Sequence, residues 1–132
     1  MSGESDLKKL LASLQPKLLA EEYIFCSFPD ANYGDHPELQ PFAAIEEPEG
    51  LTLVVPRILA DRANLPYDAV FRVITLSVHS DLEAVGLTAA LSGRLADQGL
   101  SANVIAGYFH DHIFVQSRFA ERALATLAES GQ

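Results

Sequence analysis

The sequence lacks a second cysteine, a long apolar run and an excess of basic residues. Because Cys26 is the only cysteine, no internal disulfide can form, and a cytoplasmic location is expected. The longest apolar runs fall far short of the roughly 20 residues that cross a bilayer, so no membrane segment is expected. The acidic, amphipathic start of the chain is not typical of a signal peptide.

The charge balance and the missing motifs argue against further classes of protein. A net charge of -9 disfavours nucleic-acid binding, because contacts to the phosphate backbone need clustered lysine and arginine. The chain contains no GxSxG motif, no P-loop and no Rossmann glycine pattern. Cys26 has no sequence neighbour that would activate its thiol. We therefore expect a protein that is not an enzyme and needs no cofactor.

Apolar periodicity and turn residues indicate the elements of the first half. Leu7, Leu10, Leu11 and Leu14 lie on one helical face, and Pro16 ends that helix. The stretch "PDANYGDHPELQP" is rich in Pro, Asp, Asn and Gly and predicts a loop with at most one turn of helix. The other expected elements are strands at Glu22–Phe28, Phe42–Glu47 and Leu51–Pro56 and a short helix at Pro56–Leu65.

The pattern is clearer in the second half. The run from Val70 to Val78 is β-branched and apolar on both faces near its start, which is typical of a central strand. Ser80 and Glu83 form a capping box, so a helix is predicted to begin there and to end at Gly99. Its apolar face carries Leu87, Ala90, Leu91 and Leu95. The later expected elements are strands at Ser101–Tyr108 and His112–Gln116 around the turn Phe109–Asp111, and a helix at Arg118–Ser130.

Both halves follow the same order of elements, with a degenerate first helix in the first half. A strand, a helix and a strand followed by a hairpin and a second helix fold most simply as an antiparallel sheet with helices on one face. The sequence therefore predicts an α+β fold of two ferredoxin-like βαββαβ units with antiparallel sheets. Residues 1–68 would hold a leading helix and the degenerate unit, and residues 69–132 the second unit. The strand from Val70 is a candidate to close the first unit while it opens the second.

The run "VITLSVHSDLEAVGLTAALSGRLADQGLSANVIAGYFHDHIFV" resembles ACT domains, the small ligand-binding modules of amino-acid-regulated enzymes. The resemblance rests on a strand, a helix start with Ser80, Asp81 and Gly86, and the segment "GLSANV" before the next strand. Through "EGLTLVVP", "FRVITLSVHSDLEAVGLTAA" and "HDHIFV", the whole chain is similar to a bacterial group of uncharacterised, stand-alone tandem ACT-domain proteins. In place of the usual D-x-P-G loop it has "DLEAVG", which is closer to aspartokinase-type ACT units.

This resemblance implies an amino-acid site where the loop faces the next strand across a subunit or domain interface. Asp81 would accept the ligand ammonium, and backbone N–H groups near Val85 and Gly86 would meet its carboxylate, as a helix N-terminus favours. The implied ligand-binding residues are Ser80, Asp81, Leu82, Val85, Gly86, Ser101, Ala102, Asn103 and Val104.

A simpler interpretation of the same residues stays open. Ser80 and Glu83 could serve only to cap the helix, and Gly86 could serve only to let the helix approach the sheet. Asn103 lies early in a strand, where asparagine is disfavoured, so it either contacts a ligand or satisfies a neighbouring loop.

The chain has four histidines, and two of them, His110 and His112, are two positions apart. On a strand they would point to the same face, as a pair of metal ligands can. No second paired ligand motif accompanies them, however. The other interpretation is a hairpin turn, "FHDH", whose aspartate favours a tight bend. The sequence favours this turn, and no metal is expected.

The sequence thus predicts a non-catalytic regulatory ACT-domain protein. We expect it to bind a small molecule, namely an amino acid, to act through a ligand-linked change at a unit or subunit interface, and to form a homodimer. Neither nucleic acid nor membrane is an expected partner. The alternatives are a module that binds only protein, or a small metal-dependent or acid/base enzyme that uses His79, Asp81, His110 and His112.

Overall fold

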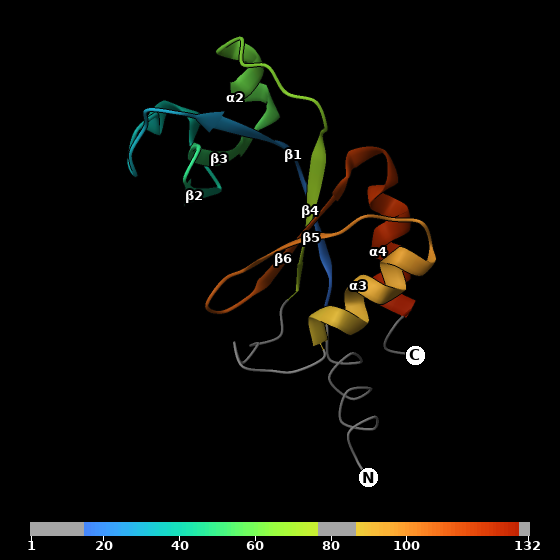
Figure 1. The fold of residues 1–132 in the computed structure, drawn as a ribbon. Helices are drawn as coiled ribbons and strands as arrows, with labels where there is room; N and C mark the ends of the chain where they lie inside the picture. The colour runs from blue at the N-terminus through green and yellow to red at the C-terminus, as the bar shows by residue number, and fades with distance from the viewer. Residues whose placement is uncertain (1–14, 77–86, 130–132) are drawn as a thin grey trace. The chain divides into compact units, whose positions relative to one another are not determined.

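The computed structural model describes residues 15–76 and 87–129, whose helices and strands are drawn in Figure 1. The buried residues of this structure form two hydrophobic cores. Each core belongs to one compact unit. One unit is Glu21–Phe71, and the other combines the described residues up to Ala20 with those from Arg72 onward. Both units are ferredoxin-like, as the order of sequence elements predicts. None of the helices in the described residues is long and apolar enough to cross a membrane.

The unit Glu21–Phe71 is built on three strands in the order β2-β3-β1. β3 pairs antiparallel with both of the other strands. Tyr23 of β1 lies opposite Pro56 of β3, and Ala43 of β2 lies opposite Val54 of β3. Alternate residues of β3 and one residue each from β1, η1 and α2 fill its core, namely Leu51, Leu53, Val55, Ile24, Leu39 and Ala60. The elements are β1 (Lys17–Phe28), η1 (Pro37–Leu39), β2 (Ala43–Glu47), β3 (Gly50–Pro56) and α2 (Arg57–Arg62).

The other unit has the strand order β1-β4-β6-β5, to which β1 contributes its first residues. Figure 1 shows α3 and α4 together on one side of these strands. The core between them and the strands consists of Ile74, Leu76, Leu91, Leu95, Leu100, Ile113, Val115, Ala120, Ala123 and Leu127. The elements are β4 (Phe71–Leu76), α3 (Leu87–Asp97), β5 (Asn103–Ala106), β6 (Asp111–Gln116), η2 (Ser117–Phe119) and α4 (Ala120–Glu129).

The end of α3 shows how a local signal positions the next strand. Gly99 has a φ of 75°, a conformation that glycine adopts without steric cost, as a helix stop requires. The Gly99 amide donates to Ala96 O at 2.9 Å, and the Leu100 amide donates to Leu95 O at 2.9 Å. Leu100 is thereby turned into the core, where it is 5 % exposed. The predicted stop of this helix at Gly99 is confirmed.

Most predicted elements are present, with shifted ends. The expected loop after β1 contains a single turn of helix, Pro37–Leu39, as predicted. Pro56 ends β3 in an extended conformation, because it pairs with Tyr23, and α2 begins one residue later. The predicted leading helix and the capping box of Ser80 and Glu83 lie outside the described residues.

The first strand differs most from the prediction. We expected a strand from Glu22, but β1 begins at Lys17, directly after Pro16. Its residues up to Ala20 group with the second half of the chain, whereas the later ones build the Glu21–Phe71 unit. The strand shared between the two units is therefore β1, and β4 from Arg72 onward belongs to one unit only.

Candidate functional site

The strand half of the implied amino-acid site lies at the start of β5. Asn103 is the first residue of β5 and pairs with Phe114 of β6. The side chains of Ser101 and Asn103 are exposed, whereas Ala102 and Val104 pack against the core. This alternation follows from the two-residue period of an extended chain. Ser101 and Asn103 are therefore the two members of this segment whose side chains can reach a bound molecule.

The other half of the implied site lies outside the described residues: Ser80, Asp81, Leu82, Val85 and Gly86. β5 is the last strand in the order of its unit, so one of its edges faces away from β6. An edge strand presents backbone N–H and C=O groups that a ligand or a second chain can use. The site residues remain a prediction.

The histidine pair lies on the β5–β6 hairpin. The ring centroids of His110 and His112 are 6.4 Å apart, and His112 Nδ1 lies 3.0 Å from Thr75 Oγ1. Burial lowers the pKa of His112, the nearby His110 lowers it further, and Asp111 partly opposes them. Among residues 15–76 and 87–129, no three His, Cys, Asp or Glu residues gather where they could hold a metal ion.

The turn of this hairpin differs from the predicted Phe109–Asp111. The residue pair next to the turn is Ala106 of β5 and Asp111 of β6. Within the turn, the amide of Gly107 donates to His110 O at 2.8 Å. Asp111 therefore begins β6, where it is only 8 % exposed, and does not occupy the bend. Four residues form the turn, and Tyr108 at its tip is 77 % exposed.

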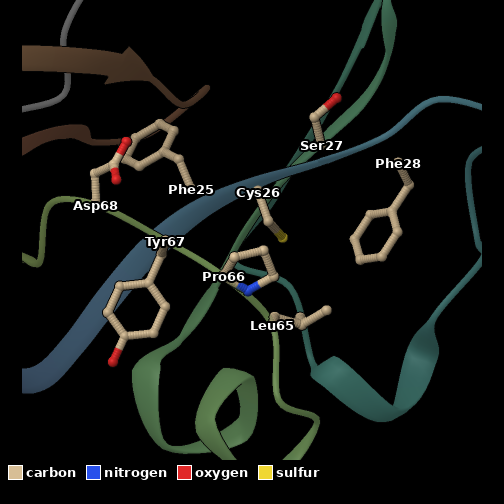
Figure 2. Close-up of a pocket in the computed structure, with 8 residues that line it drawn as sticks. All are labelled: Phe25, Cys26, Ser27, Phe28, Leu65, Pro66, Tyr67 and Asp68. Atoms are coloured by element: carbon tan, nitrogen blue, oxygen red, sulfur yellow. The ribbon is translucent and has the colours of Figure 1, made fainter.

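A cavity of about 290 Å³ lies within the Glu21–Phe71 unit, at a place that sequence reasoning missed (Figure 2). Its walls come from the end of β1 and from the segment that follows α2. Figure 2 shows Cys26 pointing from β1 toward Leu65 and Pro66, whereas Ser27 points away from them. The lining residues are Phe25, Cys26, Ser27, Phe28, Leu65, Pro66, Tyr67 and Asp68.

The thiol in this cavity is held in its neutral form. Cys26 Sγ donates to Leu53 O at 3.6 Å, and burial raises the pKa of the thiol. A raised pKa reduces the thiolate that nucleophilic chemistry needs. Cys26 therefore acts as an apolar wall with a weak donor, and the cavity has no activated nucleophile there.

A network of charged groups fixes the Tyr67 wall of the cavity. The Tyr67 hydroxyl donates to Asp61 Oδ1 at 2.7 Å and accepts from Arg57 Nε at 3.0 Å. Arg57 also donates from Nη1 to Glu22 Oε1 at 3.0 Å. These hydrogen bonds, that to Tyr67 foremost, raise the pKa of Arg57 above its usual value. The Tyr67 ring is thus anchored to α2 and to β1 through its hydroxyl.

A second hollow, of about 310 Å³, lies in the loop after β1 and shares the Phe28 wall. The His36 ring stacks on Phe28 with centroids 4.0 Å apart. His36 has a φ of 61°, and its Nδ1 lies 3.6 Å from Glu38 Oε2. This hollow is lined by Phe28, Pro29, Asp30, Ala31, Asp35 and His36.

Two family models, each described as an ACT domain, match residues 2–72 and 69–129. The first match covers more than half of the chain, and the second covers most of the remainder. The chain belongs to the ACT-domain family. The resemblance inferred from the sequence is therefore confirmed, as is the fold of two ferredoxin-like ACT units. The two matched ranges overlap at residues 69–72, so the division at residues 68 and 69 stays a prediction.

Solved structures extend the comparison. A protein of unknown function and possible transport protein from Vibrio cholerae is 50 % identical, with a TM-score of 0.90, over 99 % of this chain and 100 % of its own. The ligand-free regulatory subunit of aspartate kinase from Thermus thermophilus is 11 % identical, with a TM-score of 0.64, over 91 % of this chain and 99 % of its own. An Agrobacterium tumefaciens protein is 19 % identical, with a TM-score of 0.67, over 89 % of both chains. The latter two likenesses show the fold alone. No curated protein matches the chain.

The two ACT units place different structures after their first strand. In the C-terminal ACT unit, β4 is followed by the segment of Ser80 to Gly86 and then by α3. In the N-terminal ACT unit, β1 is followed by a loop with only the short η1. Among the described elements, an α-helix between the first two strands is therefore present in the C-terminal ACT unit alone.

Proposed function

We propose that this protein is a regulatory, non-catalytic ACT-domain protein that binds an amino acid. The observation that carries the proposal is the pair of ACT domains at residues 2–72 and 69–129, since ACT domains are typically regulatory ligand-binding modules. Its acidic composition and single cysteine suit the cytoplasm, where we place it.

The ligand site combines the segment Ser80 to Gly86 with the start of β5. Asp81 accepts the ligand ammonium, and amides near Val85 and Gly86 donate to its carboxylate. The exposure of Asn103 and Ser101 supports this assignment, because both side chains are available to donate or accept a hydrogen bond.

Regulation follows from a difference in ligand affinity between two states of an interface. A ligand shifts such an equilibrium only by as much as its affinities for the two states differ. The edge strands β2 and β5 offer places where a second copy can add to the sheet. We therefore propose a homodimer as the regulated form, with amino-acid binding linked to its interface.

Thermal unfolding in the presence of each common amino acid tests the proposal. A ligand at about 100 times its Kd adds about 2.7 kcal/mol to the free energy of unfolding, which a melting-temperature shift detects. Asn103→Ala should reduce this shift, whereas Asn32→Ala, at an exposed loop position in the N-terminal unit, should leave it unchanged. If no amino acid at millimolar concentration raises the melting temperature, the proposal is wrong.

A further inference from the structure

The cavity in the Glu21–Phe71 unit has walls whose chemistry favours a cation over an anion. Of its lining residues, Asp68 alone carries a formal charge at neutral pH, and none is a lysine or arginine. The nearby Arg57 guanidinium is engaged by Glu22, Tyr67 and Asp61 and is thus committed within the protein. The lining residues therefore offer no cationic side chain to pair with a carboxylate ligand, whereas the Asp68 carboxylate can pair with a protonated amine.

Aromatic residues of the lining suit an ammonium group. Figure 2 shows the Phe25 ring beside the Asp68 carboxylate. Phe25 and Tyr67 both line the cavity, and aromatic rings attract cations. Phe25 is itself held by an edge-on contact with Phe71, with ring centroids 5.3 Å apart.

The remaining walls suit a short apolar body. Phe28, Leu65 and Pro66 contribute carbon surfaces, and the neutral thiol of Cys26 adds another. The volume of about 290 Å³ is at the low end of ligand pockets, which run from about 300 Å³ upward. Because the Tyr67 hydroxyl is anchored to Arg57 and Asp61, one wall is already ordered without a ligand.

We propose that this cavity binds a small protonated amine with a short aromatic or branched aliphatic body, which places its ammonium group at Asp68. This site is separate from the amino-acid site of the proposed function, and it lies wholly within the N-terminal ACT unit. The two sites differ in chemistry, because the residues that line this cavity include no lysine or arginine to pair with the carboxylate of an amino acid.

Titration of the ¹⁵N-labelled full chain tests the site. The probes are phenethylamine and isoamylamine, with phenylacetate and 2-phenylethanol as the anionic and neutral counterparts. We expect saturable amide shifts at Phe25, Cys26, Ser27, Phe28 and Asp68 with an amine and weaker binding, by about tenfold or more, with the counterparts. Shifts confined to residues 101–104 would instead report the amino-acid site and would overturn the proposal.

Two matched variants complete the experiment. Asp68→Asn, at an exposed position, should weaken amine binding about tenfold, because a charge-assisted hydrogen bond is lost. Asp97→Asn removes an equal charge from an exposed position on α3 and should leave amine binding unchanged. The proposal is overturned if neither amine binds, if phenylacetate binds as tightly as phenethylamine, or if Asp68→Asn binds as wild type does.

Discussion

Single residues of this protein are constrained most where the backbone folds tightly, and Gly50 is the sharpest example. Gly50 opens β3 with a φ of +147°, a conformation that other residues rarely adopt. A Cβ atom built there would lie 2.7 Å from Pro29 Cα and 2.9 Å from Phe28 O. Both contacts are with backbone atoms, which cannot turn aside as a side chain can.

We therefore expect Gly50→Ala to lower the free energy of unfolding by about 1–3 kcal/mol. Gly93→Ala is the matched control, because Gly93 lies within α3 and its added Cβ would meet nothing within 4 Å. That variant should gain about 0.5–1 kcal/mol. Urea unfolding of both variants measures the difference. Equal stabilities for the two would contradict the close approach of β3 to the Phe28–Pro29 backbone.

His112 links stability to pH. Burial and His110 lower its pKa in the folded protein below the ordinary 6.5. As the pH falls below about 6.5, the unfolded chain takes up a proton that folded His112 still resists, so stability is lost. Above that pH the neutral ring is present in both states, and the contribution is complete.

We expect the His112 ring to titrate with a midpoint below 6.5 in an NMR experiment, and the unfolding free energy to fall between pH 7 and pH 5. His112→Gln should flatten this slope, since glutamine keeps a hydrogen-bonding group for Thr75 Oγ1 but does not titrate. A midpoint at or above 6.5 would show that the ring is not desolvated in the folded state.

At the scale of elements, α3 shows the division between its buried and exposed faces. Leu95 is 0 % exposed, whereas its neighbour Arg94 faces away from the core. Leu95→Ala should cost about 2–5 kcal/mol, since it leaves a void among the other core residues. Arg94→Ala, on the same helix, should change stability by no more than about 0.5 kcal/mol. Chemical unfolding of the two variants provides the comparison.

The segment after α2 is held to that helix by the Tyr67 hydroxyl. Tyr67→Phe removes its bonds to Asp61 and Arg57 and should cost about 1 kcal/mol. Tyr108→Phe, at the exposed hairpin tip, removes the same atom without such a loss and serves as the control. Hydrogen exchange should also quicken at the amides of residues 65–68 in Tyr67→Phe alone. Unchanged exchange there would show that the hydroxyl does not order this wall.

At the scale of the whole molecule, the decisive question is how the edge strands are covered. β2 ends the strand order of the N-terminal unit and carries Ile45, which is 42 % exposed. Sedimentation equilibrium should give twice the mass of the chain for the proposed homodimer. Ile45→Lys should weaken that dimer, because a lysine on an edge strand opposes strand addition. Ile58→Lys, on the exposed side of α2, is the control and should leave the dimer unchanged. A monomer at every concentration would refute the dimer.

Local signals were sufficient to predict the order of the described elements. Apolar runs bounded by turn residues predicted β2, β3 and β6, and a β-branched apolar run predicted β4. The three- and four-residue spacing placed Leu91 and Leu95 on the core face of α3. Of the candidate site, the sequence also placed Asn103 at the start of a strand. Which neighbours of Asn103 point outward required the register of β5, because a shift of one residue exchanges the two faces.

Other features depend on residues that are far apart in the sequence. β1 extends back to Lys17 because its first residues pair with β4. No local pattern in "KLLAEE" predicts this pairing. The cavity forms because Phe25–Phe28 and Leu65–Asp68 come together around α2. Likewise, Asp111 looked like a turn residue because aspartate is common in turns, but its pairing with Ala106 makes it part of β6.

The sequence by itself determined the repeat of two ACT-like units, the helix stop at Gly99 and the expectation of a ligand-binding protein. These depend on periodicity, on glycine conformation and on motifs, which are all local. Only the tertiary structure decided that β1 is divided between two units and that a cavity with the single charge of Asp68 exists. The physical reason is that strand pairing and cavity walls are made by side chains and backbone groups from distant segments, whose meeting is fixed by packing and not by local preference.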